Sequence, residues 1–160
     1  MKKDEILSFD VKLIGYFQRL FLPVSRIAIF LVYFWFGVLK IFNLSPAGPL
    51  AKALIERTIG LQYFDVLYVI LAIFECIIGV LFLFPKLTRI VIPLLFVHMV
   101  IVCSPLLLVP DIAWTAPFVP TLEGQYIIKN GVIIAVAIGI AASAVPLVKS
   151  DRVAGKYSIK

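Results

Sequence analysis

Long runs of apolar residues dominate the sequence, and short polar or proline-containing stretches separate them. Four runs each extend over about 18 to 24 residues, enough for an α-helix to cross about 30 Å of hydrocarbon. They lie at residues 24–42, 63–84, 87–109 and 125–148. Lipid offers no hydrogen-bond partner to an open strand edge, and four strands are too few to close a barrel, so each run is predicted to be a helix.

Two other segments have the mixed pattern of surface helices. Residues 5–22 include SFDVKLIGYFQRLF, and residues 49–60, in the first connector, include PLAKALIERTI. We expect both to be short amphipathic helices on the membrane surface, the first on the cytoplasmic side. The predicted fold is a single all-α integral membrane domain, a four-transmembrane-helix antiparallel bundle with short amphipathic surface helices.

The composition agrees with a lipid environment. Hydrophobic residues make up 62% of the 160 residues, and the mean hydropathy is +1.10. A soluble domain is about 45–50% apolar, and a small one buries only about two-thirds of its surface. The lipid bilayer is therefore the expected partner of most of these side chains.

The net charge of +6 is distributed asymmetrically along the chain. Eleven of the 15 Lys and Arg residues lie in the N-terminal segment, in the connector between the second and third runs, and in the C-terminal tail. This asymmetry predicts that both termini are cytoplasmic and that connectors 43–62 and 110–124 face the periplasm or the cell exterior. No basic stripe is interleaved with aromatic residues, so nucleic acid is not expected as a partner.

Four ionisable residues stand out inside the predicted spans, namely Lys40, Glu75, His98 and Lys129. Such a residue suggests a functional site because it is costly in lipid unless it is paired or hydrated. By residue count, Glu75 lies about 18 Å and His98 about 16 Å from the outer boundary, whereas the two lysines lie within about 3–6 Å of it. The sequence thus predicts a carboxylate–imidazole level near the mid-plane and a two-lysine level above it.

Each level has two interpretations. Glu75 and His98 form either a proton-active pair that carries protons or grips a quinone carbonyl, or a structural hydrogen bond that fixes helix register. Lys40 and Lys129 either extend to the interface along their apolar stems or form a positive mouth for a small anion. Gln125 and Asn130 add hydrogen-bond donors near Lys129, so all six residues are candidate ligand-binding residues.

Recognisable catalytic motifs are absent from the sequence: there is no P-loop, GxGxxG, GxSxG or HExxH. One His beside one Glu is a poor metal site, so no metal is expected. Cys76 and Cys103 lie inside apolar runs and are interpreted as small packing residues. We therefore assign no catalytic residue and do not expect the chain to be an enzyme by itself.

Four short motifs, in order and spacing, resemble the DoxX-like family of small bacterial four-helix membrane proteins. They are Arg26 at the start of the first run, FWFGVLK at 34–40, FECIIGVLFLFP at 74–85 and GQYIIKN at 124–130. The resemblance covers residues 23–148. It implies a four-helix membrane fold with Lys40, Glu75 and Lys129 lining the bundle. It also implies a place in a membrane redox or oxidative-stress system, with quinone as a possible cofactor.

Three functions remain open from the sequence. The first is an accessory component of a redox or oxidative-stress system that binds a quinone or a small anion between its helices. The second is a membrane scaffold that recruits other membrane or redox proteins. The third is a small transporter or channel, which with four spans would require a homo-oligomer.

Overall fold

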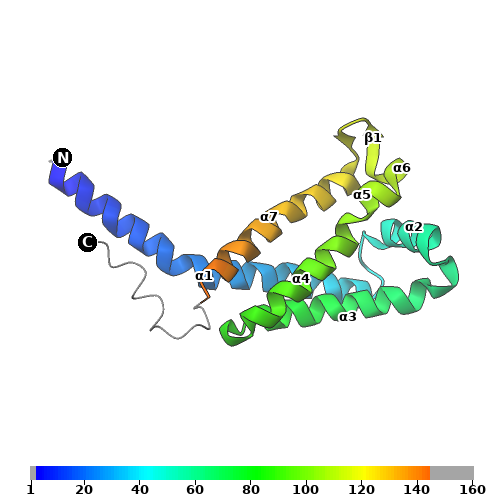
Figure 1. The fold of residues 1–160 in the computed structure, drawn as a ribbon, viewed down its shortest axis with the longest axis horizontal. Coiled ribbons are helices and arrows are strands. Elements are labelled where there is room, and N and C mark those ends of the chain that lie inside the picture. The colour runs from blue at the N-terminus through cyan, green and yellow to red at the C-terminus, as the bar shows by residue number, and fades with distance from the viewer. Residues whose placement is uncertain (1–2, 145–160) are drawn as a thin grey trace, which may run out of the picture.

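The structure is a computed structural model that describes residues 3–144, and most of these residues are helical (Figure 1). In chain order the elements are α1 (Lys3–Ile41), α2 (Gly48–Thr58), η1 (Leu61–Tyr63), α3 (Phe64–Phe82), η2 (Pro85–Leu87), α4 (Thr88–Cys103), α5 (Pro105–Leu108), α6 (Pro110–Ala113), β1 (Trp114–Ala116), β2 (Val119–Pro120) and α7 (Leu122–Ala142).

The prediction of four long apolar helices is confirmed. The segments that are long and apolar enough to cross a membrane are Leu7–Ile41, Leu61–Phe82, Pro85–Leu108 and Leu122–Ala142. Each contains most of one predicted run, although residues 145–148 of the fourth run lie outside the described residues. The connector helix expected at 49–60 is present as α2.

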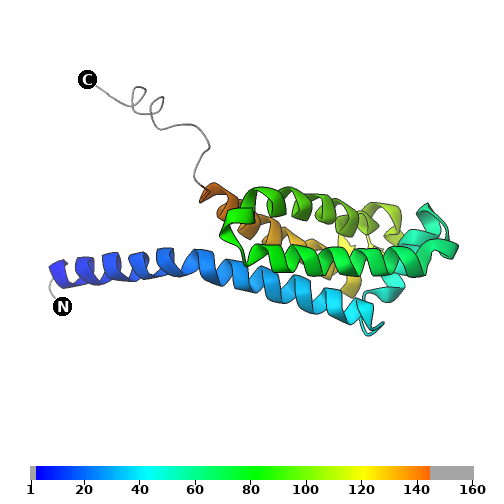
Figure 2. The ribbon, with the colours of Figure 1, turned by 90° about the horizontal axis from the view of Figure 1, so that it is seen from below.

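The N-terminal segment differs from the expectation. Residues 5–22 do not form a separate surface helix but continue without interruption into the first span, as the 39-residue α1. Pro23 lies inside this helix. A proline removes one backbone hydrogen bond, and long apolar helices tolerate this loss. The first part of α1 extends beyond the other long helices (Figure 2).

Two glycines allow α1 and α3 to approach closely. A Cβ atom at Gly37 would lie 2.7 Å from the Sγ of Cys76, and one at Gly79 would lie 2.9 Å from the backbone N of Phe34. Larger residues at these positions would push the helices apart. The contact through Gly37 and Gly79, here called the α1–α3 seam, fixes the register of the two helices.

The hydrophobic core lies where α1, α3, α4 and α7 meet. Phe82, Ile78, Leu95, Ile140 and Val91 are its largest fully buried side chains. Large apolar side chains also cover the outward faces of the long helices, which is the distribution expected of helices surrounded by lipid.

Arg26 joins three elements at the end of the bundle that contains η2. Its Nη1 donates to the carbonyl of Phe82 (3.2 Å), and its Nη2 donates to Oγ1 of Thr88 (2.6 Å). The guanidinium thus lies at the C-terminus of α3, where a cation is stabilised by the helix dipole. The arginine that opens the first predicted span therefore holds the turn between α3 and α4.

The opposite end, here called the connector end, carries α2, α5, α6 and a short hairpin (Figure 1). The antiparallel strands β1 and β2 were not predicted, because five residues in a proline-containing loop give no periodic pattern. Thr121 is the N-cap of α7, as its sequence position suggests, and its Oγ1 accepts from the N–H of Gly124 (3.0 Å). Arg57 of α2 pairs with Asp111 of α6 (2.6 Å).

Candidate functional site

Four polar side chains from three of the long helices meet inside the apolar interior. Tyr33 and Lys40 come from α1, Glu75 from α3 and His98 from α4, and all four are buried. Tyr33 and Lys40 share a face of α1 because they are seven residues apart, close to two helical turns. The three helices thus present their polar positions toward one another.

Direct contacts join these four side chains into one chain of hydrogen bonds. The ammonium of Lys40 donates to both carboxylate oxygens of Glu75. Nε2 of His98 lies 3.0 Å from Oε1 of Glu75, and the hydroxyl of Tyr33 lies 3.0 Å from Nδ1 of His98. We call this arrangement Lys40–Glu75–His98–Tyr33 the polar chain.

The chemistry of the partners assigns the protons along the polar chain. An ionised carboxylate only accepts hydrogen bonds, so Nε2 of His98 must carry the hydrogen that faces Glu75. Nδ1 of a neutral imidazole then accepts from the hydroxyl of Tyr33. With Lys40 and Glu75 both charged, the polar chain has no net charge, which suits its burial among apolar side chains.

Aromatic rings surround the imidazole. The ring of Tyr33 lies 5.1 Å from that of His98 in an edge-on arrangement, and the ring of Phe74 lies 6.0 Å away. These contacts fix the ring orientation that both hydrogen bonds need. The arrangement can transfer a proton between neighbouring groups, because each contact joins a donor directly to an acceptor.

The depth of Lys40 differs from the expectation that placed it with Lys129 near the outer boundary. Gly37 packs against Ala72 and Cys76, in the middle of α3, so α1 ends well below the level at which α3 begins. Lys40 therefore lies at the level of Glu75. Lys40 thus belongs with Glu75 and His98 and not in a separate lysine level. Residue counts missed this because packing, not chain position, sets the stagger of two helices.

The three candidates on α7 are placed differently. Gln125 and Lys129 are exposed and Asn130 is half-buried, and within residues 3–144 no hydrogen bond or ion pair joins them to the polar chain. Gly124 and Ile127 form the buried face of this part of α7, and Gln125 and Lys129 lie on another face. The ammonium of Lys129 instead lies 5.1 Å above the ring of Tyr126.

Tyr33 was missed in the sequence because it lies in an aromatic-rich run, IAIFLVYFWF, whose residues are equally suited to packing. Its spacing of seven from Lys40 is the one signal that could have identified it. That signal acquires meaning only when the partner of Lys40 is known.

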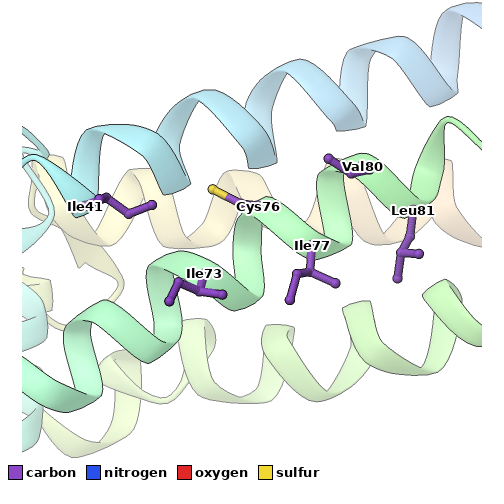
Figure 3. Close-up of a pocket in the computed structure, with 6 residues that line it drawn as sticks. All are labelled: Ile41, Ile73, Cys76, Ile77, Val80 and Leu81. Carbon is purple, nitrogen blue, oxygen red and sulfur yellow. The ribbon is translucent and has the colours of Figure 1, made fainter.

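An apolar groove of about 280 Å³ lies along α1 and α3 (Figure 3). Its lining residues are Ile41, Ile73, Cys76, Ile77, Val80 and Leu81. On α3, Ile73 and Ile77 are each two residues from Glu75, about 200° around the helix. The groove and the Lys40–Glu75 pair therefore lie on opposite sides of the α1–α3 seam.

The described residues bring no three His, Cys, Asp or Glu side chains together as a metal-binding group. No family model matches the chain, and comparison with curated proteins and with solved structures gave no significant match. Geometry and the sequence motifs therefore carry the functional argument.

Proposed function

We propose that the chain is a DoxX-like protein of the bacterial inner membrane, an antiparallel bundle of four spans that serves a redox or oxidative-stress system. Its role is to bind a quinone or a small anion next to a proton-active group. The observation that carries this proposal is the polar chain, in which Lys40, Glu75, His98 and Tyr33 contact one another inside an apolar bundle.

The cost of burying charge supports a functional reading of the polar chain. A buried ion pair is often no more stable than apolar residues of the same volume, so stability alone gives weak reason to keep one. A carboxylate–imidazole–phenol sequence offers a proton donor and acceptor at a depth that bulk water does not readily reach.

The groove along α1 and α3 offers a place for the apolar part of such a ligand. Its lining residues include Ile41 and Cys76, which directly follow Lys40 and Glu75 in the sequence. A polyprenyl tail in this groove would bring the attached ring near the α1–α3 seam. Contact with the polar chain then requires the two helices to part at Gly37, which packs against the side chain of Cys76 and the carbonyl of Ala72.

Quinone binding tests the proposal directly. The full chain, purified in mild detergent, is titrated with a short-chain ubiquinone and binding is followed by tryptophan fluorescence. Glu75→Gln is expected to weaken binding at least about tenfold, the loss of one hydrogen bond to a charged group. Lys129→Gln, a change on an exposed face outside the polar chain, is the control. Equal binding by wild type and Glu75→Gln would refute the role of the polar chain.

A scaffold is the second candidate function. It is favoured by the contacts within the polar chain, since each of its four side chains has a partner among the other three and holds helices together without a ligand. A scaffold would keep its protein partners in Glu75→Gln, the variant that is expected to weaken quinone binding. Co-purification of redox or other membrane proteins, or of a second copy, with both variants in mild detergent separates the two functions.

The orientation belongs to the same proposal, with both termini in the cytoplasm. It predicts that a reporter that is active only in the periplasm is inactive at the C-terminus and active when inserted after Pro117, in the hairpin loop. The opposite pattern would reverse the orientation.

A further inference from the structure

Tyr68 has a buried hydroxyl without a partner. Its side chain is only 3% exposed, and its Oη makes no hydrogen bond among the described residues. Burying a hydroxyl with no partner destabilises a folded protein, so it calls for an explanation. The hydroxyl lies outside the polar chain, because Tyr68 is seven residues before Glu75 on the same face of α3, about 10 Å toward the connector end.

The hydroxyl faces the first turn of α2. A Cβ atom built on Gly48, the first residue of α2, would lie 3.6 Å from Oη of Tyr68. The Ser45 side chain lies near the hydroxyl, and its Oγ accepts from the N–H of Ala47 (3.3 Å). Oη is therefore directed at the end of a helix.

That helix end has an unused donor. The N–H groups of Gly48 and Ala51 donate to the carbonyls of Ser45 and Ala47, and Pro49 has no N–H. The N–H of Leu50 has no acceptor among residues 3–144, and no side chain caps α2. Unpaired amides and the helix dipole make such an end attractive to anions.

Exposed charges of both signs flank this end, Lys52 on α2 and Asp65, three residues before Tyr68, on α3. Lys52 lies one turn into α2, four residues after Gly48, and is exposed. Glu75, a carboxylate on the Tyr68 face of α3, is neutralised by Lys40. The Tyr68 hydroxyl and the Leu50 N–H can both donate, so an acceptor oxygen complements them, and the helix dipole favours one that carries negative charge.

We propose that the Tyr68 hydroxyl and the first turn of α2 form a binding site for a small oxyanion at the connector end of the bundle. The oxyanion is either a free ion, such as a carboxylate or sulfate, or the phosphate of a lipid headgroup, since both present the same acceptor oxygens. This inference rests on the proposed function in one respect, that the chain binds a small anion. The site itself is separate from the polar chain.

The test uses thermal unfolding of the full, delipidated chain in detergent. Sodium sulfate is compared with sodium chloride at equal ionic strength, and dihexanoyl phosphatidylglycerol is added in a second series. Sulfate is expected to raise the Tm in a saturable manner, as binding to the folded state requires. A rise with the phosphatidylglycerol alone identifies the lipid headgroup as the source.

Two variants assign the effect to the site. Tyr68→Phe removes the unpaired hydroxyl, so it is expected to raise the Tm without anion and to weaken anion binding at least about tenfold. Gly48→Ala fills the space before Oη at an ordinary contact distance, so the chain still folds while the anion is excluded. Tyr16→Phe, which removes an exposed hydroxyl in the N-terminal part of α1 and outside both sites, is the matched control and keeps the anion response.

The outcomes are distinct. No anion-dependent rise with either probe, or the same rise in Tyr68→Phe and Gly48→Ala as in the wild type, overturns the site. Quinone binding by Tyr68→Phe is expected to be unchanged. A failed sulfate titration with intact quinone binding would therefore remove this inference alone. Equal quinone binding by the wild type and Glu75→Gln would instead remove the proposed function.

Discussion

Lys40, in the last turn of α1, forms an ion pair with Glu75, in the middle of α3. The pair is buried on the inner side of the α1–α3 seam, and His98 adds a second contact to the same carboxylate. The two helices are thus joined by close packing at the glycines of the α1–α3 seam and by the neighbouring Lys40–Glu75 ion pair.

Removing one member of the pair is expected to cost far more than removing both. Lys40→Met leaves a buried carboxylate uncompensated, and Glu75→Gln leaves a buried ammonium, so each single variant should lose about 3–5 kcal/mol of unfolding free energy. The double variant should recover most of that loss. Unfolding in detergent, analysed as a double-mutant cycle, measures the coupling. Additive losses would contradict a direct ion pair.

The hydrogen-bond order along the polar chain predicts one imidazole tautomer. Nitrogen-15 NMR of the histidine-labelled chain, which has a single His, should show a protonated Nε2 and an accepting Nδ1. Tyr33→Phe should shift the Nδ1 resonance and destabilise the chain by about 1 kcal/mol. Tyr126→Phe, on the exposed face of α7, is the control and should change neither. A protonated Nδ1 in the wild type would reverse the proposed order.

The α1–α3 seam predicts opposite effects for two glycines. In Gly79→Ala, the new methyl group would meet the backbone of α1 at 2.9–3.2 Å, so the helices must separate at a cost of about 1–3 kcal/mol. Gly131→Ala, in α7, meets nothing within 4 Å, and the gain in helix propensity should stabilise the chain by up to about 1 kcal/mol. The same thermal shift for both would contradict close packing at Gly79.

The Arg57–Asp111 pair gives a pH dependence at the connector end. Hydrogen bonds from Arg57 hold the pKa of the Asp111 carboxyl below its usual range. Because the pKa is lower in the folded state, the pair stabilises the fold above about pH 4, the ordinary pKa of an aspartate, and this contribution is lost as the pH falls further. The effect should be small and weakened by salt, because both side chains are exposed.

The measurement is the difference in Tm between the wild type and Asp111→Asn from pH 7 to pH 3. The difference should shrink in the acidic part of this range. In Arg57→Gln this pH dependence should be absent. If the pH dependence persists in that variant, it comes from a group other than the Arg57–Asp111 pair.

The sequence by itself determined the helical character and the number of long apolar helices. Length and hydropathy suffice, because a run of about 20 apolar residues has few alternatives to a helix. The connector helix, the N-cap at Thr121 and the choice of Glu75 and His98 as candidate site residues follow from equally local signals. Lys40 was also identified, but its partner was not.

Tertiary structure decided how the polar residues meet. Stagger between α1 and α3 depends on where Gly37 and Gly79 fit the opposite helix, and this places Lys40 on Glu75 instead of near Lys129. Rotation of α7 turns Gln125 and Lys129 away from the polar chain. Tyr33 is identified as a candidate residue only by its contact with His98, and Tyr68 only by its hydroxyl without a partner. Residue counts along a chain give depth within one helix, whereas contacts depend on register and rotation between helices.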